Sequence, residues 1–230
     1  MPLPPLLDEL LRARGPTGFE DAVSAIVRRE AAALGAEVEV DVLGSTVARV
    51  AGSGAGRLLA LVAHVDQVGL AVSHVFDDGL VGVTPLGNWD APAALGQRFE
   101  ILAGGGVVPA LARRVGDGDV EWTQLRLDLG VANGKDAAAL VRVGDPATFA
   151  SVPAELAGGR VTTPAADDRA GLFAALEVLR RLAAEPAAWD VALVASTQEE
   201  GTAHGSARAA IERLRPDVAV VVEVTYATDA

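Results

Sequence analysis

The stretch Val191-Ala192-Leu193-Val194-Ala195-Ser196-Thr197-Gln198-Glu199-Glu200-Gly201 joins five apolar residues to a pair of adjacent glutamates. An apolar run of this length is typical of a strand that is buried on both faces of a sheet. In open α/β sheets, ligands bind at the carboxyl ends of the strands, which is where Glu199 and Glu200 follow. Two crowded carboxylates need a cation or a shared proton to offset their repulsion. The stretch therefore predicts an α/β sheet with metal chemistry at its edge, although an isolated Glu-Glu pair is more often a solvated acidic loop.

The composition limits the classes of protein to which the chain can belong. It has 230 residues, of which 50% are hydrophobic, and a mean hydropathy of +0.32, without an uncharged apolar run long enough to span a membrane. The net charge of −12 argues against partners such as nucleic acid or an anionic membrane. Because there is no Cys and no secretory signal pattern, we expect a soluble cytoplasmic protein that holds any metal with His, Asp and Glu.

Segments on both sides of the quoted stretch alternate between helical and strand patterns. Leucines at helical spacing predict a helix before Gly15, and a second helix is expected from about 20 to 34, with Thr17 or Asp21 as its cap. An almost continuous apolar run predicts a central strand that ends in His64. Further strands are expected at 37–42, 46–50 and, buried, at 218–222, and further helices at 169–184 and about 204–214.

The middle of the chain, from about 70 to 160, has a different character. Its apolar runs are short and are separated by glycine and aspartate turns, of which Asp77-Asp78-Gly79 is a strong hairpin signal. One short helical pattern, 135–141, interrupts them. These features predict a small antiparallel barrel or sandwich that is inserted into an α/β host.

Four groups of acidic residues or histidine follow apolar strands or open a helix. On an extended backbone His64 and Asp66 face the same side, so the carboxylate can orient the imidazole. The Asp167-Asp168 pair suits a helix N-terminus equally well. Glu223 follows five apolar residues, and a carboxylate at the end of a buried strand needs a partner. Each group has an ordinary structural explanation, but their joint occurrence favours a metal site.

The chain resembles the glutamyl and tetrahedral aminopeptidase family of dinuclear metallopeptidases, whose members are also labelled cellulase M or endoglucanase. The likeness covers nearly the whole chain and rests on His64-Val65-Asp66-Gln67-Val68-Gly69, Ala166-Asp167-Asp168-Arg169-Ala170-Gly171, Gln198-Glu199-Glu200, Glu223-Val224-Thr225-Tyr226-Ala227-Thr228-Asp229 and the amino-terminal Gly15-Pro16-Thr17-Gly18-Phe19-Glu20. Asp128-Leu129-Gly130 and Val143-Gly144-Asp145 are similar to the family's inserted dimerisation domain. The resemblance implies a three-layer α/β/α catalytic domain with a central mixed sheet at 1–69 and 161–230, and a barrel-like oligomerisation insert at 70–160.

The same resemblance implies two divalent metal ions, zinc or cobalt. His64 would bind the first ion, Asp167 would bridge both ions, and Glu200 would bind the second. Glu223 would be the terminal ligand of the first ion, at a position where the family usually has Asp.

The remaining roles concern proton transfer and orientation. Glu199 would act as general base toward a metal-activated water, and Asp66 would orient His64. The peptide bond between Asp167 and Asp168 would be cis.

Family chains continue for over a hundred residues and supply a second histidine. We therefore expect a truncated chain that binds at most one metal well and has little peptidase activity alone. Neither His74 nor His204 is expected to replace the missing ligand. An apolar sheet edge near 218–222 should invite association.

The function that these residues favour is hydrolysis of amino-terminal peptide bonds, with peptides as substrates and a homo-oligomer, a dimer or a dimer-based assembly, as the expected form. A related dinuclear amidohydrolase that removes acyl groups is an alternative within enzymes. A non-catalytic oligomerising module is an alternative from another class. A glycosidase would need paired carboxylates about a sugar ring, for which the pattern offers no reason.

Overall fold

The computed structural model describes residues 3–54, 56–150, 152–201 and 205–225. The chain divides into two compact units, which we call the sheet unit, up to Gln67 and from Val152 onward, and the barrel unit, Val68–Ser151. The sheet unit contains α1 (Pro5–Arg12), α2 (Asp21–Ala33), β1 (Glu37–Val40), β2 (Thr46–Val50), β3 (Leu58–His64), the hairpin β10 (Ala154–Leu156) and β11 (Arg160–Thr162), α5 (Ala166–Ala184), β12 (Asp190–Ser196), α6 (Gly205–Leu214) and β13 (Val218–Val221).

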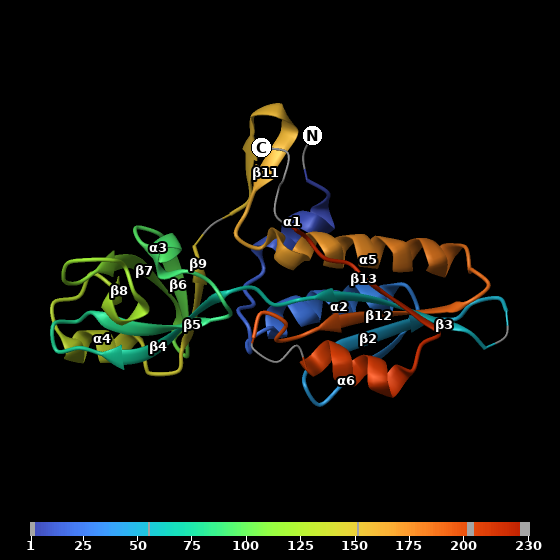
Figure 1. Cartoon of the computed structure of the whole chain (residues 1–230), viewed down its shortest axis with the longest axis horizontal. Helices are drawn as coiled ribbons and strands as arrows, with labels where there is room; N and C mark the ends of the chain where they lie inside the picture. Colours follow the sequence, from blue (N-terminus) through green and yellow to red (C-terminus); the bar gives the residue numbers. More distant parts are fainter. Residues whose placement is uncertain (1–2, 55, 151, 202–204, 226–230) are drawn as a thin grey trace. The chain divides into compact units, whose positions relative to one another are not determined.

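The sheet unit has the three layers that the sequence predicts. Its five-stranded sheet has the order β1-β2-β12-β3-β13, with β12 and β13 parallel to β3 and β2 antiparallel to β12. Alternate side chains of β3 face opposite sides, since Leu61 and Ala63 pack with α2 and α5, whereas Ala60 and Val62 pack with α6. Figure 1 shows α5 and α6 on opposite sides of the sheet. This mixed α/β/α arrangement confirms the predicted fold class.

Two expectations about the sheet unit need correction. The residues of β13 are exposed rather than buried, with Val221 68% exposed, because within the described part of the chain the strand lies at the edge of the sheet and pairs with β3 alone. The expectation of a buried strand was wrong, whereas the expected apolar sheet edge near 218–222 is present. Helix α2 has no side-chain cap, because the N-cap position is Glu20 and the hydroxyl of Thr17 donates instead to the Asp66 carboxylate. His204, the expected first residue of the last helix, lies outside the described residues, and α6 begins at Gly205.

The barrel unit is a closed antiparallel barrel in the order β4-β5-β8-β7-β6-β9. The predicted hairpin turn at Asp77-Asp78-Gly79 joins β4 to β5, and Gly79 adopts the positive φ of +87° that this turn requires. Aromatic and aliphatic side chains such as Phe99, Ile101 and Leu127 fill the interior. The elements of the unit are β4 (Gly69–Val75), β5 (Val81–Leu86), α3 (Ala91–Ala94), β6 (Arg98–Ala103), β7 (Gly106–Arg114), β8 (Leu125–Asp128), α4 (Gly134–Leu140) and β9 (Pro146–Phe149).

Among the described residues, none of the helices combines the length and the apolar character that crossing a membrane demands.

Candidate metal centre

Three parallel strands bring the predicted site residues to one edge of the sheet. His64 is the last residue of β3, and in the register of β12 it lies opposite Ser196. In β13, Val221 lies opposite Val62, so Glu223 follows at the level of His64. Because parallel strands end on the same side of a sheet, the loops that follow β3, β12 and β13 meet there.

The Nε2 atom of His64 faces three carboxylates. It lies 2.8 Å from Oδ1 of Asp167, 3.7 Å from Oε2 of Glu223 and 4.0 Å from Oε2 of Glu199. The His64 side chain is 2% exposed, whereas those of Asp167 and Glu223 are 55% and 41% exposed. The imidazole therefore forms the floor of the site, and the carboxylates line its open side.

The donor atoms of His64, Asp167 and Glu223 have the spacing of a metal site. One ligand atom from each residue lies within 4.8 Å of the other two. Ligands around a tetrahedral ion with bonds near 2.0 Å are roughly 3.3 Å apart, which lies within the observed range. An imidazole nitrogen with two carboxylate oxygens also suits a borderline divalent ion. The residues present therefore fit a metal ion.

The other ring nitrogen of His64 is held by Asp66. Nδ1 lies 3.1 Å from the backbone oxygen of Asp66 and 3.4 Å from its carboxylate Oδ1. A proton on Nδ1 leaves the lone pair of Nε2 directed at the carboxylate group. Burial lowers the pKa of His64, but hydrogen bonds to Asp167 and Asp66 outweigh it and raise the pKa to about 11. The site thus strongly favours a positive charge at this position, either a proton or a cation.

Asp66 also holds the loop that carries the glutamate pair. Its fully buried carboxylate accepts the N–H of Glu199 at 3.0 Å, the N–H of Glu200 at 3.1 Å and the hydroxyl of Thr17. Burial raises the pKa of Asp66, but the hydrogen bonds from His64 and Thr17 hold it below its usual value. The ionised carboxylate is therefore the stable form.

Glu200 lies outside the group formed by His64, Asp167 and Glu223 but responds to the same charges. Burial, followed by the charge of Asp167, raises the pKa of Glu200 to about 7. Burial also raises the pKa of Glu223. Near neutral pH, a cation would compete with a proton at Glu200.

The Asp167–Asp168 peptide bond is cis, as predicted. The two side chains diverge, because Asp167 contacts His64 whereas Asp168 is fully buried and accepts the N–H of Gly171 at 3.0 Å. A Cβ at Gly171 would lie 2.3 Å from Oδ1 of Asp168, so a larger residue here would displace this buried carboxylate. Asp168 therefore acts as a helix cap, and only Asp167 reaches the candidate metal site.

Comparison with known proteins places this geometry in a family. The family model described as M42 glutamyl aminopeptidase matches residues 44–230. The chain belongs to this family.

M42 relatives match almost the whole chain. It is 31% identical over 238 residues to the lysyl aminopeptidase of Pyrococcus furiosus, and the alignment covers 96% of this chain and 66% of the relative. It is 28% identical over 244 residues to the glutamyl aminopeptidase of Lactococcus lactis, with coverage of 96% and 66%. The solved structure of an aminopeptidase from Desulfurococcus kamchatkensis superposes with a TM-score of 0.91 at 31% identity, covering 98% of this chain and 63% of that chain. The chain thus spans about two thirds of the length of these relatives.

The structure describes all six of the predicted M42 site residues. His64, Asp66, Asp167, Glu199, Glu200 and Glu223 meet at the edge of the sheet. His74, which was not expected to be a ligand, belongs to β4 of the barrel unit and packs against Phe76 with ring centroids 4.5 Å apart. His204 and residues 226–229 of the last signature lie outside the described residues.

Sequence reasoning missed Glu20. This residue is 7% exposed, and its carboxylate accepts the N–H of Gln198, next to the glutamate pair. The available signal was its place at the end of the amino-terminal Gly15-Pro16-Thr17-Gly18-Phe19-Glu20 signature, which precedes the residues matched by the M42 model.

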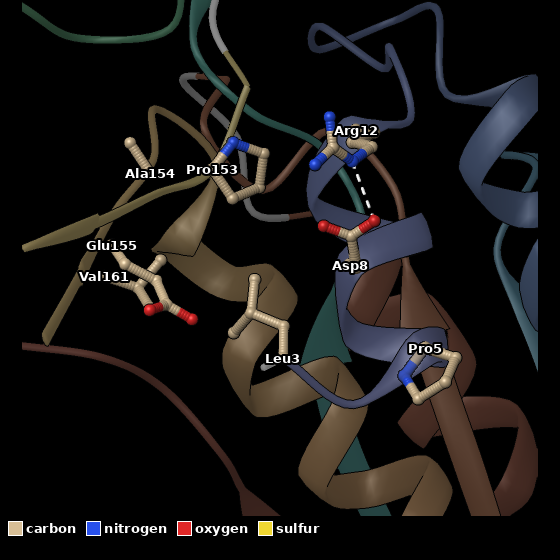
Figure 2. A pocket seen from close by; sticks show the side chains of 8 residues that line it. All are labelled: Leu3, Pro5, Asp8, Arg12, Pro153, Ala154, Glu155 and Val161. Carbon is tan, nitrogen blue, oxygen red and sulfur yellow. Dashed lines mark hydrogen bonds and ion pairs between the residues drawn. The ribbon is translucent and has the colours of Figure 1, made fainter. Parts of the chain in front are cut away.

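A pocket of about 360 Å³ lies elsewhere in the sheet unit, between α1 and the β10–β11 hairpin. Figure 2 shows its lining, in which Asp8 and Arg12 pair with each other at 2.7 Å beside Leu3 and Pro153. None of its lining residues belongs to the predicted M42 site. The candidate chemistry thus lies at the sheet edge.

Proposed function

We propose that this M42 chain works as a metal-dependent aminopeptidase that removes amino-terminal residues from peptides. The observation that carries the proposal is the arrangement around Nε2 of His64, where Asp167 and Glu223 stand at ligand spacing and Glu199 lies 4.0 Å away. The names of the relatives, lysyl and glutamyl aminopeptidase, support the same class of reaction.

His64, Asp167 and Glu223 would hold one divalent ion, and Asp167 with Glu200 would contribute to a second. Zinc or cobalt suits these nitrogen and oxygen donors. Such ions, when bound, lower the pKa of a coordinated water and polarise a peptide carbonyl.

The chain's own residues orient the ligands and move the proton. The backbone N–H of Glu199 donates to Asp66, which fixes the loop at this point. The carboxylate of Glu199 faces Nε2 of His64, the same atom that Asp167 and Glu223 face. From there Glu199 would take the proton of the attacking water and pass it to the leaving amine. Asp66 keeps the proton of His64 on Nδ1, which leaves Nε2 available as a ligand.

An assay with paired substrates tests the proposal. The chain, loaded with Zn²⁺ or Co²⁺, is given aminoacyl p-nitroanilides of lysine and glutamate and their N-acetylated forms. Cleavage of the free-amine substrates alone supports an aminopeptidase, whereas cleavage of the acylated forms would indicate a deacylase. Because only one tight metal equivalent is expected, turnover of the free-amine substrates should be low, and a complete absence of cleavage of both forms would refute the proposal for these 230 residues.

The metal stoichiometry is tested separately. We expect one tight equivalent per chain, because only His64, Asp167 and Glu223 form a three-ligand group among the described residues. Two tight equivalents with normal turnover would contradict this expectation.

We also propose that the barrel unit mediates a homo-oligomer. Val107 and Leu111 project from one side of β7 and are 45% and 47% exposed, and the barrel exposes Val143 to 63%. Light scattering should show a multiple of 23.4 kDa, and V107E with L111E should lower it. The sheet-unit control V42E, at a fully exposed valine, should leave the molar mass unchanged.

A further inference from the structure

The loop that follows β12 and carries Glu199 and Glu200, which we call the glutamate loop, has three consecutive backbone amides, at residues 198–200, that donate to buried carboxylates. Gln198 N–H donates to Oε1 of Glu20 at 3.0 Å, and the N–H groups of Glu199 and Glu200 donate to the two carboxylate oxygens of Asp66. Both acceptors are buried, Glu20 to 7% exposure and Asp66 completely. The position of the loop is thus determined by acids from two other segments, not by its own turn.

Glu20 contacts a second loop with the same atom. Its Oε1 also accepts the N–H of Gly18 at 2.6 Å, within the amino-terminal 15–20 loop. That loop is tied in turn to the end of β3, because Gln67 N–H donates to Gly15 and Thr17 N–H donates to Gln67, both at 3.0 Å. Glu20 therefore links the segment that follows His64 to the loop that carries Glu199.

A buried cation, Arg169, interacts with the charge of Glu20, whose pKa is raised by burial. Arg169 is fully buried and donates to the backbone oxygens of Leu10 at 2.8 Å and Ala13 at 3.2 Å, at the end of α1. Its charge interacts with both Glu20 and Asp66. Arg169 belongs to α5 and follows the Asp167-Asp168 pair. Its hydrogen bonds to Leu10 and Ala13 therefore connect the helix that carries Asp167 to the amino-terminal part of the chain.

Glu20 binds the loop at Gln198, the loop residue with an unusual backbone conformation. Gln198 has a φ of +56°, in the left-handed region that residues other than glycine seldom occupy. Its side chain is exposed, and its backbone N–H is held by the carboxylate of Glu20. Without an acceptor at that point, this partly buried N–H would lose its hydrogen bond, which favours another loop conformation.

We infer that Glu20 is a positioning residue of the M42 site, which fixes Gln198 and thereby places Glu199 and Glu200 against His64. It acts through the loop and does not touch the reacting atoms. The family match begins at residue 44 and so does not include it. The effect on turnover rests on the proposed function of Glu199, whereas the effect on the loop does not.

Amide hydrogen exchange in E20A and E20Q tests the placement directly. E20A should speed exchange at Gln198, Glu199 and Glu200 by at least about tenfold, while E20Q, whose amide oxygen can accept both N–H groups, should keep most of the protection. The matched control is D145A, which removes an acid of equal 7% exposure that accepts the N–H of Arg142 in the barrel unit. D145A should speed exchange around Arg142 and leave the glutamate loop unchanged.

Kinetics and metal binding then test the consequence. E20A should lower kcat by up to about 100-fold with little change in KM, because a small displacement of a catalytic group is costly, and E20Q should restore most of the rate. The absorption spectrum of the Co²⁺-loaded chain should shift in E20A and not in D145A. If the wild-type chain proves inactive, the proposed function fails, but the exchange data still decide the role of Glu20. Wild-type protection at residues 198–200 in E20A, or equal deprotection of this loop in E20A and D145A, would overturn the inference.

Discussion

The edge of the sheet and the barrel unit bury acids for different purposes. In the barrel unit, Asp145 accepts the N–H of Arg142, three residues earlier, and lies 3.4 Å from the guanidinium of the same residue. At the sheet edge, Asp66 accepts hydrogen bonds from Thr17, Glu199 and Glu200, which are distant in the sequence. A buried acid with local partners stabilises a turn, whereas one with distant partners assembles a site.

The two described histidines repeat this contrast. His64 is buried among carboxylates, and its pKa rises to about 11. His74 is exposed on β4 and contacts the ring of Phe76. The same residue type therefore serves as a ligand candidate in one unit and as a surface packing residue in the other.

The largest expected effect separates these histidines. H64A should lower the affinity for Zn²⁺ by more than about 100-fold and reduce peptidase activity to background, because it removes the only nitrogen ligand of the group formed by His64, Asp167 and Glu223. H74A should leave both unchanged. Isothermal titration and the p-nitroanilide assay measure the two quantities. Equal losses in the two variants would remove the distinction between the units.

The next effect separates metal binding from proton transfer. E199Q should lower kcat by about 10² to 10⁴-fold, because it removes the proposed general base, while Zn²⁺ affinity stays near that of the wild type. E212Q, on the exposed surface of α6, is the control and should retain full activity. A large loss of Zn²⁺ affinity in E199Q would show that Glu199 is a ligand instead.

A pair of core substitutions compares the units through stability. Leu193 in β12 and Leu127 in β8 are both 0% exposed, so L193A and L127A should each lower the free energy of unfolding by about 2–5 kcal/mol. Only L193A should also weaken Zn²⁺ binding, since β12 carries the glutamate loop. Urea denaturation and metal titration give the two measurements, and weaker binding in L127A would argue against separate roles.

The last effect concerns pH. The pKa of His64 in the folded protein, about 11, exceeds its unfolded value of about 6.5. Without metal, the stabilisation from its proton is complete below pH 6.5 and is lost as the pH rises toward 11. Since Zn²⁺ must displace that proton, its affinity should rise about tenfold per pH unit between pH 8 and 10. Titration calorimetry in buffers of different ionisation enthalpy should show proton release, and a pH-independent affinity would contradict this assignment.

Local patterns were sufficient to predict most elements and to favour a metal site, whereas the individual ligands were implied by the family resemblance. The apolar run that ends in His64 corresponds to β3, and Asp77-Asp78-Gly79 forms the predicted turn. Such features depend on periodicity and on turn residues within a few positions. The cis bond at Asp167 was predicted from the family resemblance rather than from local chemistry.

Features set by distant neighbours were not predictable in this way. Thr17 looked like a helix cap, but its hydroxyl donates to Asp66, 49 positions away. Val218–Val221 were expected both as a buried strand and as an apolar sheet edge, and the strand order shows that they form an edge. Glu20 carried no signal of its partnership with Gln198, which is 178 positions away.

By itself, the sequence determined that this chain has an α/β sheet with an inserted antiparallel barrel and that acids and a histidine follow its strands, because hydrophobic periodicity and turn residues act over short range. Only the tertiary structure decided which acids surround His64, which of them are buried, and that the amino-terminal Glu20 accepts the N–H of Gln198 beside the glutamate pair. The physical reason is that hydrogen bonds and charges act through space, and their partners are chosen only when the strands have been placed side by side.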